Sequence, residues 1–103
     1  MEYNIAESGH TTLVKLEGQF TFSDAKKFKN ILDLLHNGSI KAISFDFSEI
    51  TFIDSACMGM LLLLREECQS RNIDLNIHSL RGQVEKVFEI SKFDQLFSIV
   101  RNN

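Results

Sequence analysis

Two short segments of strictly alternating polarity, separated by a helix-length stretch, constrain the fold of this chain most. Apolar and polar side chains alternate one by one over residues 42–47 and again over residues 73–77. This pattern indicates strands with one covered face and one water-facing face. The intervening residues 55–70 are long enough for a crossover helix, so the two strands should run parallel with a right-handed connection. Helices should therefore cover a single face of the sheet.

Further strands are expected on either side of this unit. Residues 13–17 read as a strand that ends or bulges at Gly18. Residues 3–7 and 96–100 are candidate edge strands. The sequence predicts an α/β domain over residues 1–103 with a mixed sheet of about four or five strands and three helices packed mainly on one face.

Two helices complete this prediction. The first should start at Ser23–Asp24 and stop at Asn37–Gly38, and the last should run from Arg81 or Gly82 to Ser91. The apolar residues at helical spacing in the first are Ala25, Phe28, Ile31, Leu32 and Leu35. In the last, the residues expected to point inward are Val84, Val87, Phe88 and Ile90.

The strand that starts at residue 42 runs into Asp54 and Ser55, where the central helix pattern begins on small residues. A hydroxyl at such a strand-to-helix corner can cap the helix. The same corner can accept a phosphate, because the first amides of a helix carry partial positive charge. Ser55 is therefore either a structural cap or a chemical switch.

The central helix is apolar around almost its full circumference over residues 56–64. A helix on one face of a sheet buries only one stripe. We expect flanking helices to cover residues 61–64, and an exposed patch to surround Ala56, Met58 and Met60. Met58 is the better candidate for packing on the sheet and Met60 for contacting a partner. Exposed apolar surface beside a modifiable hydroxyl indicates a protein-binding site.

Charge and apolar content exclude several classes of function. A net charge of -3 gives no reason to expect nucleic acid or an anionic membrane as a partner. The chain starts without a secretory signal, and its longest apolar run is shorter than the roughly 20 residues that span a bilayer. We expect a cytoplasmic protein without direct membrane insertion.

The cysteines and histidines indicate neither a disulfide nor a metal site. On a helix, Cys57 and Cys68 would lie roughly 16 Å apart, too far for a disulfide. Cys57 is either a small residue in a tight corner or, with a lowered thiol pKa near a helix N-terminus, a redox sensor. The three histidines show no metal-ligand spacing. No cofactor is expected.

The segment 45–61 resembles the core signature of STAS domains, the family of the anti-sigma factor antagonists. That signature places a hydrophobic residue, Asp, Ser and then small residues at a strand–helix junction, as Ile53, Asp54, Ser55 and Ala56 do here. Residues 18–20 resemble the turn ahead of the family's first helix, and residues 79–93 resemble its third helix. Cys57 and Thr21 depart from the glycine and the acidic residue that are usual at these positions.

The resemblance implies that Ser55 is phosphorylated by the cognate anti-sigma factor, a serine kinase of the histidine-kinase-like ATPase type. The unmodified protein would bind that factor, phosphorylation would end binding, and a PP2C-type phosphatase would restore it. We expect partner contacts at Thr21, Phe22, Ser23, Asp24, Asp54, Ser55, Ala56 and Met60.

Two other classes of function compete with this switch. One is a STAS adaptor that is not phosphorylated, for example the cytoplasmic subunit of a lipid transport complex. The other is an enzyme. The sequence lacks the motifs that would support this class, namely a nucleophile elbow, a glycine-rich phosphate loop and a carboxylate pair at a plausible cleft. We therefore expect a binding module and not an enzyme.

Overall fold

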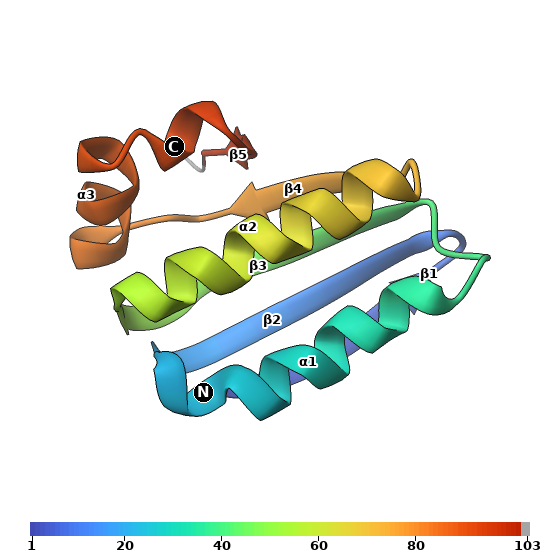
Figure 1. Ribbon diagram of the computed structural model, residues 1–103, viewed down its shortest axis with the longest axis horizontal. Coiled ribbons are helices and arrows are strands. Elements are labelled where there is room, and N and C mark those ends of the chain that lie inside the picture. Colours follow the sequence, from blue (N-terminus) through green and yellow to red (C-terminus); the bar gives the residue numbers. More distant parts are fainter. Residues whose placement is uncertain (102–103) are drawn as a thin grey trace.

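One antiparallel pair of strands starts the sheet, and every later strand runs parallel to its neighbour. The computed structural model describes residues 1–101. Strands β1 (Glu2–Ser8) and β2 (Thr11–Phe20) form the antiparallel hairpin. They are followed in spatial order by β3 (Ala42–Ile53), β4 (Asp74–His78) and β5 (Ser98–Val100) (Figure 1). Parallel neighbours need a crossover connection, and each crossover here contains a helix.

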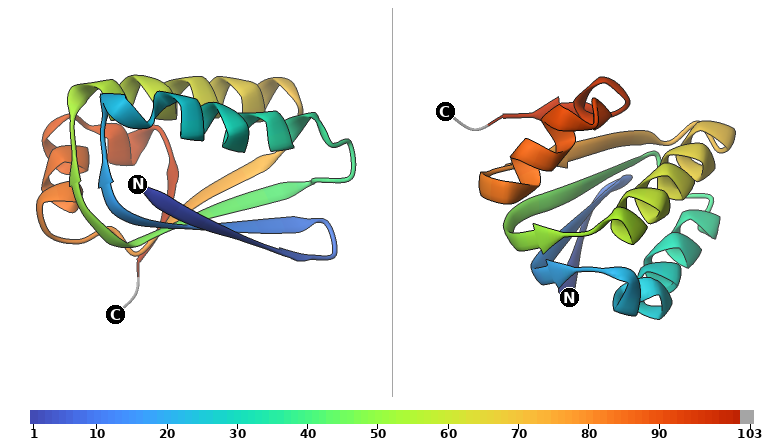
Figure 2. Two further views of the ribbon diagram at one scale, coloured as in Figure 1. Left: turned by 90° about the horizontal axis from the view of Figure 1, so that it is seen from below. Right: turned by 60° about the vertical axis from the view of Figure 1, so that its left-hand side comes forward.

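The three helices pack against the same side of the sheet. Helix α1 (Ala25–Asp33) lies between two short 3-10 turns, η1 (Phe22–Asp24) and η2 (Leu34–His36). Helix α2 (Ser55–Ser70) runs beside α1. Helix α3 (Gly82–Ile90), followed by η3 (Phe93–Gln95), lies near the end where α2 begins (Figure 2). The prediction of a mixed sheet with helices on one face is confirmed.

The alternating residues of β3 form the floor of the core. Phe45 and Phe47 are fully buried on the helix side of this strand. The Phe45 ring packs on Phe28 of α1 with 6.4 Å between ring centroids, and Phe47 packs edge-on against Phe88 of α3 at 6.1 Å. The period-two pattern in the sequence thus identified the side of the sheet that the helices cover.

A bulge separates the alternating first half of β3 from the half that leads to Asp54. The register between β2 and β3 shifts twice, near Glu17 and again after Gly18, whose φ of +93° lies in the region that glycine adopts without strain. Beyond the shift, Ile50 and Ile53 are both buried although they are three residues apart. The strand therefore continues past the end of β4 and delivers Asp54 to the start of α2.

Some apolar residues that were expected to be covered are exposed. In α2 the sheet-facing side is narrow and consists of Cys57, Leu61, Leu64 and Cys68. Leu62 and Leu63 are 36% and 47% exposed, so the prediction that flanking helices cover all of residues 61–64 is wrong. The prediction that Ile90 points inward is also wrong, since Ile90 is 81% exposed. At about 100° per residue, these positions turn away from the core.

Candidate functional site

The cap of α2 is Asp54, and Ser55 is the first residue of the helix. Asp54 has an extended backbone, and its Oδ1 accepts a hydrogen bond from the Cys57 N–H at 2.9 Å. This is the geometry of an N-cap, which satisfies one of the free amides of the first turn. The alternative in which the Ser55 hydroxyl caps the helix is therefore wrong. Ser55 is exposed, and its hydroxyl is not needed for this role.

The second oxygen of Asp54 joins two distant parts of the chain. Asp54 Oδ2 accepts a hydrogen bond from the Phe22 N–H at 3.1 Å, across 32 positions in sequence. This contact brings the segment Thr21–Asp24 beside the first turn of α2. The side chain of Phe22 is 74% exposed there. The structure therefore places the predicted contact residues of both segments in one region.

The buried Asp24 side chain holds the segment Thr21–Asp24 in place. Its carboxylate accepts hydrogen bonds from the Thr21 N–H at 2.8 Å and from the Met1 amino group at 3.0 Å. Burial alone would raise the pKa of Asp24, but the Thr21 N–H, the Met1 ammonium and Lys27 together hold that pKa below 3.8. Because Asp24 is buried, it supports the backbone of this segment and is not itself part of the exposed surface.

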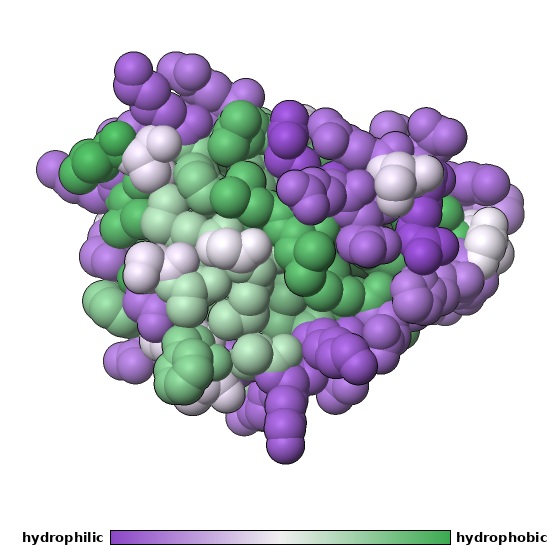
Figure 3. Space-filling model, viewed as in Figure 1, coloured by the Kyte–Doolittle hydropathy of each residue, from purple (hydrophilic) through white to green (hydrophobic). Residues whose placement is uncertain are grey.

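An exposed stripe runs along α2 from Ser55. Ser55, Gly59, Leu62 and Glu66 are spaced by four, three and four residues, which places them on one helix face. All four are exposed, and Leu63 lies next to them. A Cβ added at Gly59 would meet no atom within 4 Å, so the stripe is open. Apolar surface covers the first half of α2 around this stripe (Figure 3).

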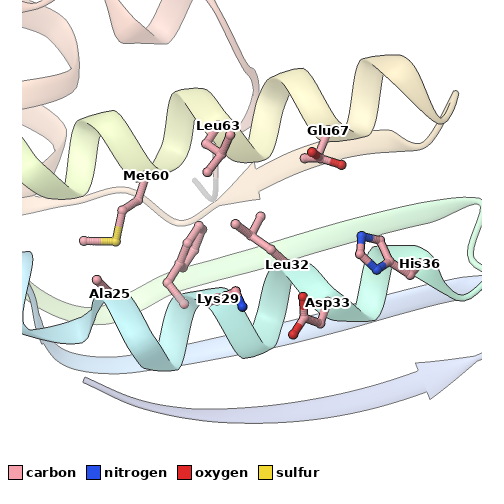
Figure 4. A pocket seen from close by; sticks show the side chains of 9 residues that line it. Ala25, Lys29, Leu32, Asp33, His36, Met60, Leu63 and Glu67 are labelled. Atoms are coloured by element: carbon pink, nitrogen blue, oxygen red, sulfur yellow. The ribbon is translucent and has the colours of Figure 1, made fainter.

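The two methionines of this helix, Met58 and Met60, are both half-buried. Met60 packs against the core and lines a groove of about 360 Å³ between α1 and α2. Figure 4 shows its side chain pointing toward Ala25, while Leu63 lies across the groove from Leu32. The expectation that Met58 packs on the sheet while Met60 faces solvent is wrong, because Cys57, Leu61 and Leu64 occupy the sheet side. The remaining groove residues are Phe28, Lys29, Asp33, His36, Leu63 and Glu67.

The thiols are unsuited to redox sensing. Burial, together with the negative charges of Asp54 and Asp24, raises the pKa of Cys57 far above its ordinary value. Burial and the neighbouring Glu67 raise the pKa of Cys68 to about 11. Both cysteines are free. The reading of Cys57 as a low-pKa thiol is therefore wrong, and its small, buried side chain fills the corner beneath Asp54.

Several classes of site find no support in residues 1–101. No group of three or more His, Cys, Asp or Glu side chains is placed to hold a metal ion. No helix in this range is long and apolar enough to cross a membrane.

Gln83, at the start of α3, contacts this site and was not identified from the sequence. Its side-chain amide hydrogen-bonds the backbone of Ile53, immediately before Asp54. No sequence motif predicts this contact, because it depends on the position of the first turn of α3 relative to the end of β3.

The cap assignment predicts unequal costs for two neighbouring substitutions. Asp54→Ala removes the acceptor of both the Cys57 and the Phe22 amides, so it should lower the free energy of unfolding by about 1–2 kcal/mol. Ser55→Ala should change it by less than about 0.5 kcal/mol. Urea denaturation of both variants measures the difference. A larger cost for Ser55→Ala would contradict the assignment of Asp54 as the cap.

Comparison with known proteins identifies this arrangement. Residues 3–101 match the model of a family described as Mlab, STAS domain. A STAS-domain containing protein of Pseudomonas aeruginosa (strain UCBPP-PA14) is 29% identical over 91 residues, which cover 88% of this chain and 89% of that protein.

Solved structures share the fold. The Bacillus cell fate determinant SpoIIAA in its phosphorylated form superposes with a TM-score of 0.77 at 15% identity, over 99% of this chain and 92% of that chain. A proposed anti-sigma factor antagonist from Thermotoga maritima gives 0.83 at 20% identity, over 99% and 86%. A sulfate transporter family protein from Wolinella succinogenes gives 0.75 at 19% identity, over 86% and 72%.

Proposed function

Because the chain belongs to the STAS domain family, we propose that it is a phosphorylation-controlled binding module that acts as an anti-sigma factor antagonist. The unmodified chain binds an anti-sigma factor that is also a serine kinase of the histidine-kinase-like ATPase type. Phosphorylation of Ser55 releases this partner, and a PP2C-type phosphatase restores binding. The chain works in the cytoplasm and contributes no catalytic group.

The position of the Ser55 hydroxyl carries this proposal. It is exposed at the start of α2, Asp54 already performs the capping, and the open stripe with Gly59 and Leu62 begins at this residue. A kinase can therefore reach the hydroxyl without unfolding the helix. A partner that covers the stripe must also cover Ser55.

Electrostatics explain why a phosphate would end binding. Phosphorylation adds about -1.5 to -2 charges at neutral pH, next to the carboxylate of Asp54. The Cys57 amide is already occupied by that carboxylate. The helix terminus returns only about 0.3–1 kcal/mol per surface charge, whereas burying an uncompensated dianion beneath a partner costs several kcal/mol. Desolvation outweighs the helix-terminus stabilisation, so docking is lost while the fold remains.

Similar folds support both this proposal and one alternative. SpoIIAA, which shares the fold, has been solved in phosphorylated and unphosphorylated forms. The sulfate transporter family protein of the same fold favours an adaptor that works without phosphorylation, for example within a lipid transport complex. The exposed hydroxyl at Ser55 favours the switch, because an adaptor does not need a phosphate acceptor at this position.

A phosphotransfer assay with Ser55 variants separates these two functions. Incubation with ATP and a histidine-kinase-like ATPase that binds the wild type should add one phosphate to the wild type and none to Ser55→Ala. Ser55→Asp should weaken binding at least about tenfold because its charge lies on the docking face, while its thermal midpoint stays within about 5 °C. Mass spectrometry, calorimetry and thermal melting provide the readouts.

The same assay identifies the outcome that would refute the switch. Full labelling of Ser55→Ala, or binding by Ser55→Asp as tight as that of the wild type, would show that Ser55 does not control the partner. Binding of the kinase with no labelling of the wild type would favour the adaptor instead.

Met60 is the methionine that we expect to contact the partner, since it lines the groove between α1 and α2 together with Leu63, which lies next to the stripe. Met60→Gln should weaken partner binding about tenfold and cost less than about 2 kcal/mol of stability, because the new amide still reaches water. Met58→Gln is the matched control on the other side of the stripe. If both variants bind the partner with the same affinity, the assignment of Met60 as the contact residue is wrong. It is also wrong if Met60→Gln unfolds enough of the protein to explain its weaker binding.

A further inference from the structure

The side chain of Gln83 ties α3 to the corner that carries Ser55. Gln83 Oε1 accepts a hydrogen bond from the Ile53 N–H at 3.2 Å, and Gln83 Nε2 donates to the Ile53 carbonyl at 3.4 Å. Strand β4 pairs with β3 only as far as Asp46–His78. Beyond that point one side-chain amide engages both polar groups of Ile53, as a neighbouring strand would.

The route of the chain into α3 places this amide. Ser79 and Gly82 both have left-handed backbones, with φ of 65° and 61°, so the chain turns sharply between β4 and the helix. Val84 and Phe88 are buried and hold α3 against the core. The first turn of the helix is thereby fixed with Gln83 facing the end of β3.

We propose that Gln83 is a positioning residue of the Ser55 site. The Ile53 carbonyl and the nitrogen and Cα of Asp54 share one rigid peptide plane, so a hydrogen bond to that carbonyl fixes the orientation of the plane that leads into Asp54. Asp54 in turn holds the Cys57 and Phe22 amides. Gln83 thus acts through Asp54 to keep the first turn of α2 in one orientation. The contact between Gln83 and Ile53 does not depend on the proposed function, whereas its importance for phosphorylation does.

Hydrogen exchange tests the positioning role in the isolated protein. Gln83→Leu removes both hydrogen bonds and keeps a side chain of similar size. Its Cys57 and Phe22 amides should exchange about tenfold faster than the loss of global stability explains. Val84→Ala, a packing change one residue away, should speed these amides only in proportion to its global destabilisation. If the two variants behave alike, Gln83 only supports the packing of α3, and the proposal is wrong.

A second variant provides a signature that packing does not produce. In Gln83→Glu, an ionised carboxylate can still accept from the Ile53 N–H, but it has no proton to donate to the Ile53 carbonyl. Below the carboxyl pKa, ordinarily about 4.3, the protonated acid regains a donor. As pH falls from 7 to below 4, the excess exchange of the Cys57 amide relative to wild type should therefore shrink more in Gln83→Glu than in Gln83→Leu. The leucine variant shares any effect of protonating the Asp54 carboxylate, which accepts from the Cys57 amide, but it has no group that regains a donor. An equal change in the two variants would overturn the proposal.

Phosphotransfer separates this inference from the proposed function. With ATP and a histidine-kinase-like ATPase that phosphorylates the wild type, Gln83→Leu should lower kcat/KM for Ser55 about tenfold. Unchanged kcat/KM despite faster exchange would show that the contact does not position the phosphate acceptor. If Ser55 of the wild type is never phosphorylated while the exchange results hold, the proposed function fails and the positioning of Asp54 stands.

Discussion

A single carboxylate organises the functional end of this molecule. Asp54 accepts one hydrogen bond from the first turn of α2 and another from the Phe22 amide of η1. Both amides belong to the ends of helical turns, where backbone donors lack partners within the helix. Because one side chain satisfies both, the start of α2 and the segment before α1 cannot move independently. The adjacent hydroxyl of Ser55 is thereby left free and exposed.

The distribution of apolar residues on α2 leaves a candidate docking face on a small domain. One side of the helix, with Cys57, Leu61, Leu64 and Cys68, faces the sheet and is buried. The opposite side carries Leu62 and Leu63 at the surface. Each Å² of these leucine side chains that stays in contact with water lowers the possible free energy of unfolding by roughly 25 cal/mol, compared with a buried side chain. A binding module provides a reason for that arrangement, since a partner would bury the same area.

Much of this fold could be predicted from short-range pattern. The alternation at Phe45 and Phe47 reports which side of β3 is covered. Helical spacing located α1 and α3, and the length of the segment between two strands located α2. Capping could not be resolved in the same way, because Asp54 and Ser55 are both good N-cap residues and differ by one position. The exposure of Leu62 depends on the spacing of neighbouring helices, and the contact of Gln83 depends on two left-handed residues in the preceding turn. These features are set by tertiary geometry.

The central claim is that a partner binds the outward stripe of α2 only while Ser55 is unmodified. NMR chemical-shift mapping of the isotope-labelled chain with the proposed histidine-kinase-like ATPase partner tests this most directly, before and after phosphorylation. We expect the largest changes at Ser55, Gly59 and Leu62, little change at Asp46 and His78 on the uncovered face of the sheet, and loss of the footprint in the phosphorylated form. A footprint centred on Asp46 and His78 that persists after phosphorylation would contradict the claim.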